Sequence, residues 1–280
     1  MNVSSELHFL HRVVSESVGK SVGRDAVWQL APVFASIAYS SDGVDNLRLF
    51  ELRVARELPR LAAHGRARAR RAFVRTKDSI TKPSYVNRLS RLVSGKCSQI
   101  EILSARFRTE PSSGGLVFSV FEPADLLRRY RPGYVPCLVS GSVLLHEGRL
   151  HLNAFFRSQS IVEFGVYDLL FLRSLQADLV KAFKAIPMES FPKRSRPRRI
   201  EAGPINLQFG RVIVQSRLAR HGTAYIRRAE AISRWMRLLE DALGDARQDY
   251  IPTIDSHIQA ERPRSFSQET DLPGHPPISV

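Results

Sequence analysis

The sequence predicts an α+β protein in which a mixed β-sheet is flanked by long helices. Short apolar or alternating segments at residues 116–121 and 143–154 are typical of strands. Two later segments, from Asp168 to about residue 186 and from Tyr225 to Leu243, carry apolar residues at helical spacing instead. A chain of 280 residues with 43% hydrophobic content is long enough to bury one large core.

The domain organisation follows from where this periodicity stops. We expect a single domain over residues 1–246, because that stretch contains no internal repeats. Residues 247–280 are rich in proline and polar residues with little periodicity, which predicts a weakly ordered tail.

The composition limits the possible partners. The formal net charge of +15 indicates an anionic partner or a soluble basic protein, without choosing among nucleotide, nucleic acid and membrane surface. The two cysteines form neither a disulfide framework nor a zinc motif. No apolar run approaches the ~18 residues that span a bilayer, and the first residues do not resemble a secretory signal. We expect a cytoplasmic protein without a membrane partner.

The N-terminal third predicts three elements. Residues 4–17 form an amphipathic helix with apolar side chains near one face. Residues 27–39 are apolar and predict a strand, which Pro32 limits to an edge or a bend. Residues 46–61 predict a helix that ends near Pro59.

A basic stretch at residues 65–77 has two interpretations. It is an anion-binding arm or a solvated linker, and we favour the linker because no aromatic residues alternate with the cations to stack bases. A helix over residues 82–94 and a strand over residues 99–107 follow. The cations of the stretch are Arg66, Arg68, Arg70, Arg71, Arg75 and Lys77.

The segment before the centre of the chain is a glycine-containing loop, a strand and a short helix. The loop at residues 109–115 contains Gly114-Gly115 but matches no phosphate-binding motif, so a flexible loop is favoured. Residues 116–121 predict the strand, and residues 125–131 predict a short helical turn.

The centre of the chain, residues 136–168, predicts a hairpin followed by a helix. Two apolar strands are separated by His146-Glu147-Gly148-Arg149, a short loop with a glycine. This places Cys137 where the first strand begins, and the pairing brings Arg157 back beside it.

These residues suggest a reactive thiolate. A neighbouring guanidinium favours the thiolate form of a cysteine, and the planar donor fork of an arginine suits phosphate. Cys137, Arg157, Ser158 and Asp168 could therefore line one cavity as nucleophile, anion clamp, hydroxyl donor and carboxylate. The alternative is a buried cysteine beside a solvated arginine, and composition alone favours that alternative.

The spacing of these residues resembles that of thymidylate synthases and the related deoxycytidylate and cytidylate hydroxymethylases. The matching positions are Pro136-Cys137, Gly148-Arg149-Leu150, Arg157-Ser158 and Asp168. Upstream, residues 115–126 are similar to the family strand that ends in a Trp-Asn-Pro-like turn. The resemblance covers about residues 114–179.

The departures from this family concern the phosphate and sugar sites. Gly114-Gly115 replaces paired arginines that reach across the family's dimer, and Ser160 replaces an aspartate. A histidine and a tyrosine that hold the sugar hydroxyl correspond to Asn206 and Gln208. An ordinary thymidylate synthase is therefore not expected.

The resemblance implies a reaction. Cys137 would add to C6 of a pyrimidine, and C5 would take a one-carbon unit from 5,10-methylenetetrahydrofolate. Arg157 and Ser158 would bind the substrate anion, with Asn206 and Gln208 at the sugar. Asp168 accompanies cytosine substrates, because an ionised carboxylate accepts from a 4-amino group. The product is a methylated or hydroxymethylated pyrimidine nucleotide or nucleoside.

The resemblance also implies a homodimer and a catalytic glutamate, for which Glu51 and Glu57 are both candidates. Two other functions stay open. One is a catalytically inactive paralogue with a binding or regulatory role, which the missing arginines favour. The other is a basic nucleic-acid-binding protein, which the arginine clusters favour; one such cluster comprises Lys193, Arg194, Arg196, Arg198 and Arg199.

Overall fold

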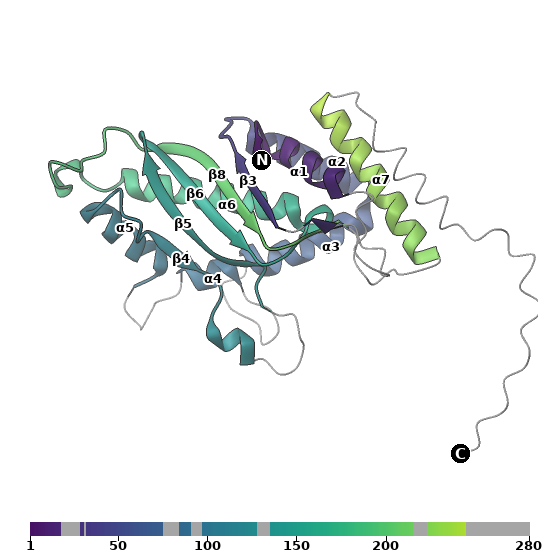
Figure 1. The fold of residues 1–280 in the computed structure, drawn as a ribbon, viewed down its shortest axis with the longest axis horizontal. Coiled ribbons are helices and arrows are strands. Elements are labelled where there is room, and N and C mark those ends of the chain that lie inside the picture. Colours follow the sequence, from purple (N-terminus) through teal and green to yellow (C-terminus); the bar gives the residue numbers. More distant parts are fainter. Residues whose placement is uncertain are drawn as a thin grey trace, which may run out of the picture.

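A six-stranded mixed sheet with helices packed behind it organises the molecule (Figure 1). The computed structural model describes residues 1–17, 29–30, 32–74, 84–90, 97–127, 135–214 and 223–244. In spatial order the strands of this sheet are β1 (Asn2–Val3), β3 (Val33–Ile37), β8 (Glu201–Phe209), β6 (Arg149–Phe156), β5 (Leu138–His146) and β4 (Val117–Ser119).

The sheet contains both kinds of strand pairing. β1 with β3 and β6 with β8 are parallel, whereas the other neighbours are antiparallel. A second, three-stranded sheet is built from β2 (Gln29–Leu30), β9 (Val212–Ile213) and β7 (Gln159–Ser160). The fold class predicted from the sequence, α+β with a mixed sheet and long helices, is confirmed.

The helices come from several parts of the chain. They are α1 (Glu6–Ser17), α2 (Gly43–Glu57), α3 (Pro59–Ala69), α4 (Tyr85–Ser90), α5 (Gln99–Thr109), α6 (Ile161–Lys184) and α7 (Thr223–Leu243). Shorter turns are a π-helical turn at Arg70–Val74 and 3₁₀ turns at Pro123–Leu127 and Met188–Ser190. No helix in the described ranges is both long and apolar enough to cross a membrane.

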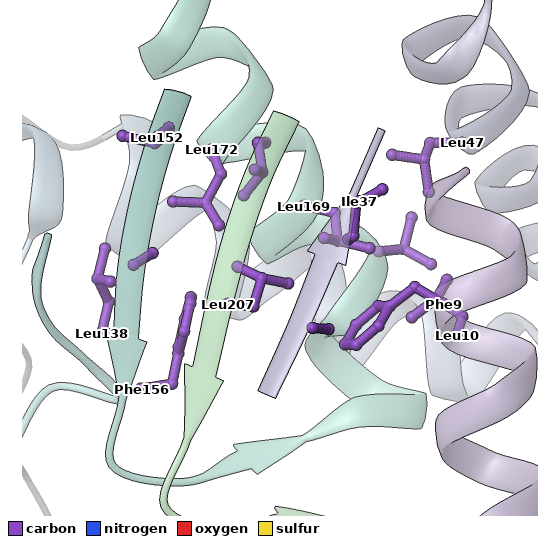
Figure 2. Close-up of a cluster of buried hydrophobic side chains, with 14 of the residues drawn as sticks. Phe9, Leu10, Ile37, Leu47, Leu138, Leu152, Phe156, Leu169, Leu172 and Leu207 are labelled. Carbon is purple, nitrogen blue, oxygen red and sulfur yellow. The ribbon is translucent and has the colours of Figure 1, made fainter. Parts of the chain in front are cut away.

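The core lies between the sheet and α6. Alternate residues of β6 and β8 point toward the helices, and Leu152 and Leu207 pack there against Leu169 and Leu172 of α6 (Figure 2). Phe9 of α1 closes the same cluster at the β3 edge. Because α6 is buried along most of its length, it is the element that positions the site residues it carries.

The predicted hairpin at the centre of the chain is confirmed. Glu147 and Gly148 have φ angles of 49° and 76°, so both residues adopt the left-handed conformation of a two-residue turn. His146 pairs with Arg149 at the end of the ladder. The turn therefore aligns β5 with β6 and returns the chain to the start of β5.

The predicted strand at residues 99–107 is wrong, because this segment is helix α5. The Ser98 side chain accepts from the backbone N–H of Glu101, and the Glu101 carboxylate accepts from the N–H of Ser98, at 3.2 and 2.6 Å. This capping box starts a helix. Leu103 and Phe107 are buried four positions apart, which is a helical and not an alternating spacing.

Two further predictions near the N-terminus need correction. The helix predicted at residues 46–61 is two helices, because Pro59 starts α3 at a position where the missing N–H is not needed. Residues 65–74 are not a solvated linker but the end of α3 and the π-helical turn; Arg75 and Lys77 lie outside the described residues.

The remaining elements agree with the predictions in type but not always in extent. The strand predicted at 27–39 is divided into β2 and β3, and β3 lies inside the sheet beside the short β1. The helix predicted at 82–94 is described over Tyr85–Ser90. α6 begins at Ile161, so Asp168 lies within this helix and not at its start. The predicted tail at 247–280 lies outside the described residues.

Candidate functional site

Cys137 lies immediately before β5, where backbone hydrogen bonds hold it from two sides. Its N–H donates to the hydroxyl of Tyr85 at 3.1 Å, and its carbonyl accepts from the N–H of Arg157 at 2.9 Å. Leu138 N–H donates to the same hydroxyl at 3.4 Å. The thiol is free and half-buried. The predicted return of the chain from Arg157 to Cys137 is therefore present in the backbone pairing.

The cation that contacts the sulfur is Arg68. Its Nη2 donates to Sγ of Cys137 at 2.7 Å, from α3. The guanidinium carbon also lies 3.8 Å from the centre of the Phe164 ring on α6, which holds the planar group in place. A guanidinium in this position stabilises negative charge on sulfur.

Asp168 contributes a buried carboxyl to the same neighbourhood. Burial raises its pKa to about 6, against the opposing effects of the Arg68 charge and of a hydrogen bond from Gln159. The amide nitrogen of Gln159 donates to Oδ2 of Asp168. The other end of that amide, Oε1 of Gln159, is buried without a partner among the described residues.

Charge interactions connect four of these groups. Burial lowers the pKa of Arg68, but the negative charges available to Cys137, Asp168 and Tyr85 outweigh burial and raise it. Burial raises the pKa of Tyr85, and the charges of Cys137 and Asp168 raise it further. We call these four residues, Arg68, Tyr85, Cys137 and Asp168, the thiol cluster.

Arg157 donates hydrogen bonds to the backbone carbonyls that precede Cys137. Its Nε and Nη2 donate to the carbonyl of Val135 at 3.1 and 2.6 Å, and Nε also reaches the carbonyl of Pro136 at 3.1 Å. Nη1 donates to the hydroxyl of Ser158 at 3.3 Å. Arg157 therefore orients the residues that lead into Cys137, whereas the sulfur itself is contacted by Arg68.

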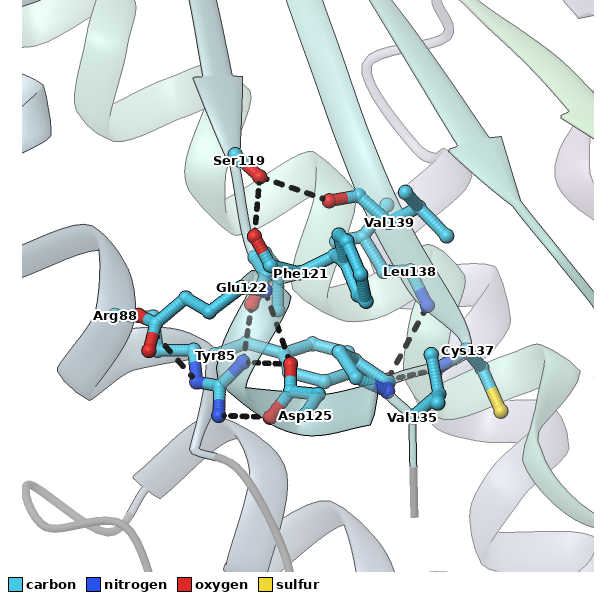
Figure 3. A network of polar contacts seen from close by, with 12 residues as sticks. Tyr85, Arg88, Ser119, Phe121, Glu122, Asp125, Val135, Cys137, Leu138 and Val139 are labelled. Atoms are coloured by element: carbon cyan, nitrogen blue, oxygen red, sulfur yellow. Dashed lines mark hydrogen bonds and ion pairs between the residues drawn. The ribbon is translucent and has the colours of Figure 1, made fainter. Parts of the chain in front are cut away.

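A buried ion pair holds the helix that carries Tyr85. Arg88, also on α4, donates to both carboxylate oxygens of Asp125 at 2.6 and 2.8 Å and to the carbonyl of Val120 at 2.6 Å (Figure 3). Both side chains of the pair are fully buried. Figure 3 shows the sulfur of Cys137 pointing away from this pair. The pair therefore links α4 to the chain after β4, and Tyr85 links α4 to β5.

The two glutamate candidates have different surroundings. Glu51 accepts from Arg66 at 2.6 and 2.9 Å and from the hydroxyl of Tyr167 at 2.8 Å. The hydrogen bond from Arg66 is the largest effect, and it lowers the pKa of Glu51. Glu57 instead contacts Arg56 and Arg234 near the surface. Glu51 is thus the glutamate that packs against α3 and α6.

Asn206 and Gln208 lie on the face of the sheet opposite the helices. They line an open hollow of about 890 Å³. Asn206 accepts from Ser36 at 2.7 Å and donates to Asn153 at 2.8 Å, so its hydrogen bonds run across the strands. The structure therefore does not bring these two side chains together with Cys137.

Sequence reasoning missed Arg68, Tyr85 and Gln159. Arg68 belonged to the basic stretch interpreted as a linker, and no local pattern distinguished it from the neighbouring arginines. A helical interpretation of residues 59–74 would have placed Arg68 about one turn after Gly65, on the same face of the helix. Gly65 lies against Tyr167 of α6, where a Cβ would come within 2.3 Å of the ring, so this face of α3 is the one that packs against α6. No group of three metal-ligating side chains occurs among the described residues.

Comparisons with known proteins add little to this geometry. No family model matches the sequence, and no curated protein matches it. Among solved structures, the chain is similar to thermostable thymidylate synthase A from Bacillus subtilis, with a TM-score of 0.45 and 14% identity. The match covers 75% of this chain and 70% of that chain.

Proposed function

We propose that the protein transfers a one-carbon unit to C5 of a pyrimidine nucleotide of the cytosine type, through a covalent adduct of Cys137. The observation that carries the proposal is the contact of 2.7 Å between Nη2 of Arg68 and Sγ of Cys137. A thiolate is the nucleophilic form of cysteine, and a partly exposed sulfur beside a fixed cation is a suitable nucleophile. The choice of a pyrimidine rests on the resemblance in motif spacing.

The residues would act in distinct ways. Cys137 would add to C6 of the base, which makes C5 nucleophilic toward the one-carbon unit. C5 would then lose its hydrogen as a proton, the C5–C6 double bond would form again, and the bond from C6 to sulfur would break. Arg68 would stabilise the charge on sulfur before the addition and after this release. Asp168 would read the amino edge of the base, with the unpartnered Oε1 of Gln159 as a second acceptor. Arg157 would hold the Cys137 backbone, and Ser158 would donate to the substrate anion.

The one-carbon donor implied by the resemblance is 5,10-methylenetetrahydrofolate. When bound, it would supply the carbon that C5 receives. The described residues around the thiol cluster do not form a recognisable set for its ring or its glutamate tail. We therefore assign no residue to the cofactor.

We also propose that the protein is a homodimer, formed through the open face of the sheet. Phe34 and Val117 are more than half exposed there, at 56% and 59%, and both line the 890 Å³ hollow. Large apolar side chains gathered on one sheet face favour a covering partner. Light scattering of the wild type and of Phe34→Asp tests this, and a monomeric wild type would contradict it.

A second function, binding without turnover, is favoured by one observation. The groups of the thiol cluster already have partners within the chain, because Arg68 contacts Cys137 and Gln159 donates to Asp168. A protein that binds a nucleotide without turnover does not need a reactive sulfur, so this arrangement suits that function as well.

Release of tritium from C5 separates the two functions. The wild type is incubated with [5-³H]CMP, [5-³H]dCMP, [5-³H]dUMP and the free nucleosides, with and without methylenetetrahydrofolate. We expect release that Cys137→Ala abolishes and that Cys97→Ser leaves intact, since Cys97 lies outside the cluster. Nucleotide binding without any release would establish the inactive alternative, and undiminished release by Cys137→Ala would remove the mechanism.

A further inference from the structure

The segment between α6 and β8 presents a run of exposed cations far from the thiol cluster. We define the cationic loop as Lys193, Arg194, Arg196, Arg198 and Arg199, all of which are exposed. In Figure 1 the segment that carries them projects at the left end of the molecule, whereas α1, α2 and α7 lie at the right. The segment leads into Glu201, which pairs with Arg149 at the turn end of the β5–β6 hairpin, whereas Cys137 precedes the opposite end of β5. It is therefore a separate surface from the site proposed above.

Buried apolar residues anchor this segment to the body of the protein. Phe191 is 3% exposed and packs edge-on against Phe107 of α5, with ring centres 5.8 Å apart. Phe107 in turn stacks on Phe183 of α6 at 4.0 Å. Pro197 and Ile200 are also buried. These contacts fix the backbone that carries the cations.

The charges of the cationic loop are largely unopposed. Among the described residues, Arg199 is the member with an ion-pair partner, Glu201. No ion pair between described residues involves Lys193, Arg194, Arg196 or Arg198. Lys181 and Lys184, exposed on the last turn of α6, add to the same sign of charge. A cluster of one sign raises the local concentration of an oppositely charged ligand.

A small hollow adjoins these cations. It has a volume of about 280 Å³, and Met188, which is 42% exposed, is its most accessible apolar side chain. The other lining residues are the buried Phe183, Pro197 and Ile200, the cations Lys184, Arg198 and Arg199, and the carboxylate Glu201. Single-stranded nucleic acid combines phosphates with bases that can leave the stack, so it is recognised by cations next to apolar or aromatic surfaces. Arginine forks suit phosphate oxygens in particular.

We propose that the cationic loop binds single-stranded nucleic acid, with phosphates on its arginines and a base in the adjoining hollow. An anionic membrane is the less suitable partner, because interfacial binding relies on apolar side chains that insert between lipids. Within residues 187–199, Met188 is the one large apolar side chain that is exposed, and a single such side chain gives little apolar area for insertion. The binding does not depend on the reaction proposed for Cys137.

Fluorescence anisotropy with a labelled oligo(dT) of about 20 nucleotides tests the proposal, over a series of salt concentrations. The quadruple variant Lys193→Gln/Arg194→Gln/Arg196→Gln/Arg198→Gln removes four charges from the loop. The matched control Arg48→Gln/Arg53→Gln/Arg56→Gln/Arg60→Gln removes four exposed charges from α2 and α3, at the other end of the molecule. Circular dichroism and thermal unfolding confirm that both variants fold.

We expect the loop variant to bind at least about tenfold more weakly, with a salt slope smaller by roughly 0.7 for each phosphate that the loop no longer neutralises. The control should bind within about twofold of the wild type, and Cys137→Ser should bind unchanged. Equal weakening in both quadruple variants would overturn the proposal, because it would show an effect of net charge alone. Binding to phosphatidylserine vesicles but not to oligo(dT) would overturn it in favour of a membrane partner.

Discussion

The guanidinium of Arg68 lies 2.7 Å from the sulfur of Cys137, although the two residues are 69 positions apart in the chain. Arg68 reaches the sulfur from α3, and the ring of Phe164 on α6 supports its other side. The contact depends on the packing of α3 against α6 and on the position of the first residue of the hairpin. Three elements thus position the guanidinium against the sulfur.

Replacing Arg68 should make Cys137 less reactive. Arg68→Gln removes the cation beside the sulfur, so we expect alkylation by iodoacetamide at pH 7.5 to slow by about tenfold, equivalent to about 1.4 kcal/mol less charge stabilisation. Mass spectrometry of the alkylated peptides measures the rate at each cysteine. Cys97 is the internal control and should react at an unchanged rate, as should Cys137 in Arg66→Gln. A Cys137 rate in Arg68→Gln equal to that of the wild type would contradict the assignment.

Asp168 should make the protein less stable as pH rises. Its pKa is about 6 in the folded protein against 3.8 when unperturbed, so the folded state keeps a proton that the unfolded state has already lost. Relative to Asp168→Asn, the free energy of unfolding of the wild type should fall between pH 4 and pH 6, by about 3 kcal/mol in total, and stay level above pH 7. Urea denaturation of both proteins across this range measures the difference. A difference that does not change with pH, or that grows in favour of the wild type, would show that Asp168 is not held in this way.

The ion pair between Arg88 and Asp125 should be far more sensitive to removal of one partner than of both. Asp125→Ala leaves the Arg88 charge buried, and we expect it to lower the free energy of unfolding by about 3–5 kcal/mol. The double variant Arg88→Met/Asp125→Leu removes both charges and should cost less than Asp125→Ala alone. Thermal and urea unfolding measure both. A double variant that is less stable than the single one would show that the hydrogen bond from Arg88 to Val120 matters more than the charge pair.

Asp168→Asn should also change the preferred base, if the proposed reaction is correct. An amide both donates and accepts, so it suits the N3–H and O4 of uracil, whereas an ionised carboxylate suits the amino edge of cytosine. We expect the ratio of tritium release from [5-³H]dCMP to that from [5-³H]dUMP to fall in the variant. The Gln159→Glu variant is a useful comparison, because it places a second carboxyl beside Asp168 without replacing it. A ratio that Asp168→Asn leaves unchanged would mean that another group reads the base.

Local patterns were sufficient where the structure depends on neighbours in the chain. Gly148 and the alternation of β6 predicted the hairpin, because a two-residue turn and strand pairing are decided within a few residues. The same approach failed at residues 99–107, where β-branched and aromatic residues suggested a strand. There the capping box of Ser98 and Glu101 was the stronger signal.

The sequence by itself determined the α+β class, the hairpin, the helices α1, α6 and α7, and the placing of Cys137 directly before a strand. These features follow from periodicity and turn chemistry, which act over short distances along the chain. The tertiary structure alone decided that Arg68 contacts the sulfur, that Arg157 binds the carbonyls before Cys137, and that Asn206 faces the other side of the sheet. Which arginine meets a given sulfur depends on how α3 packs against α6, and no short-range pattern in the sequence contains that information.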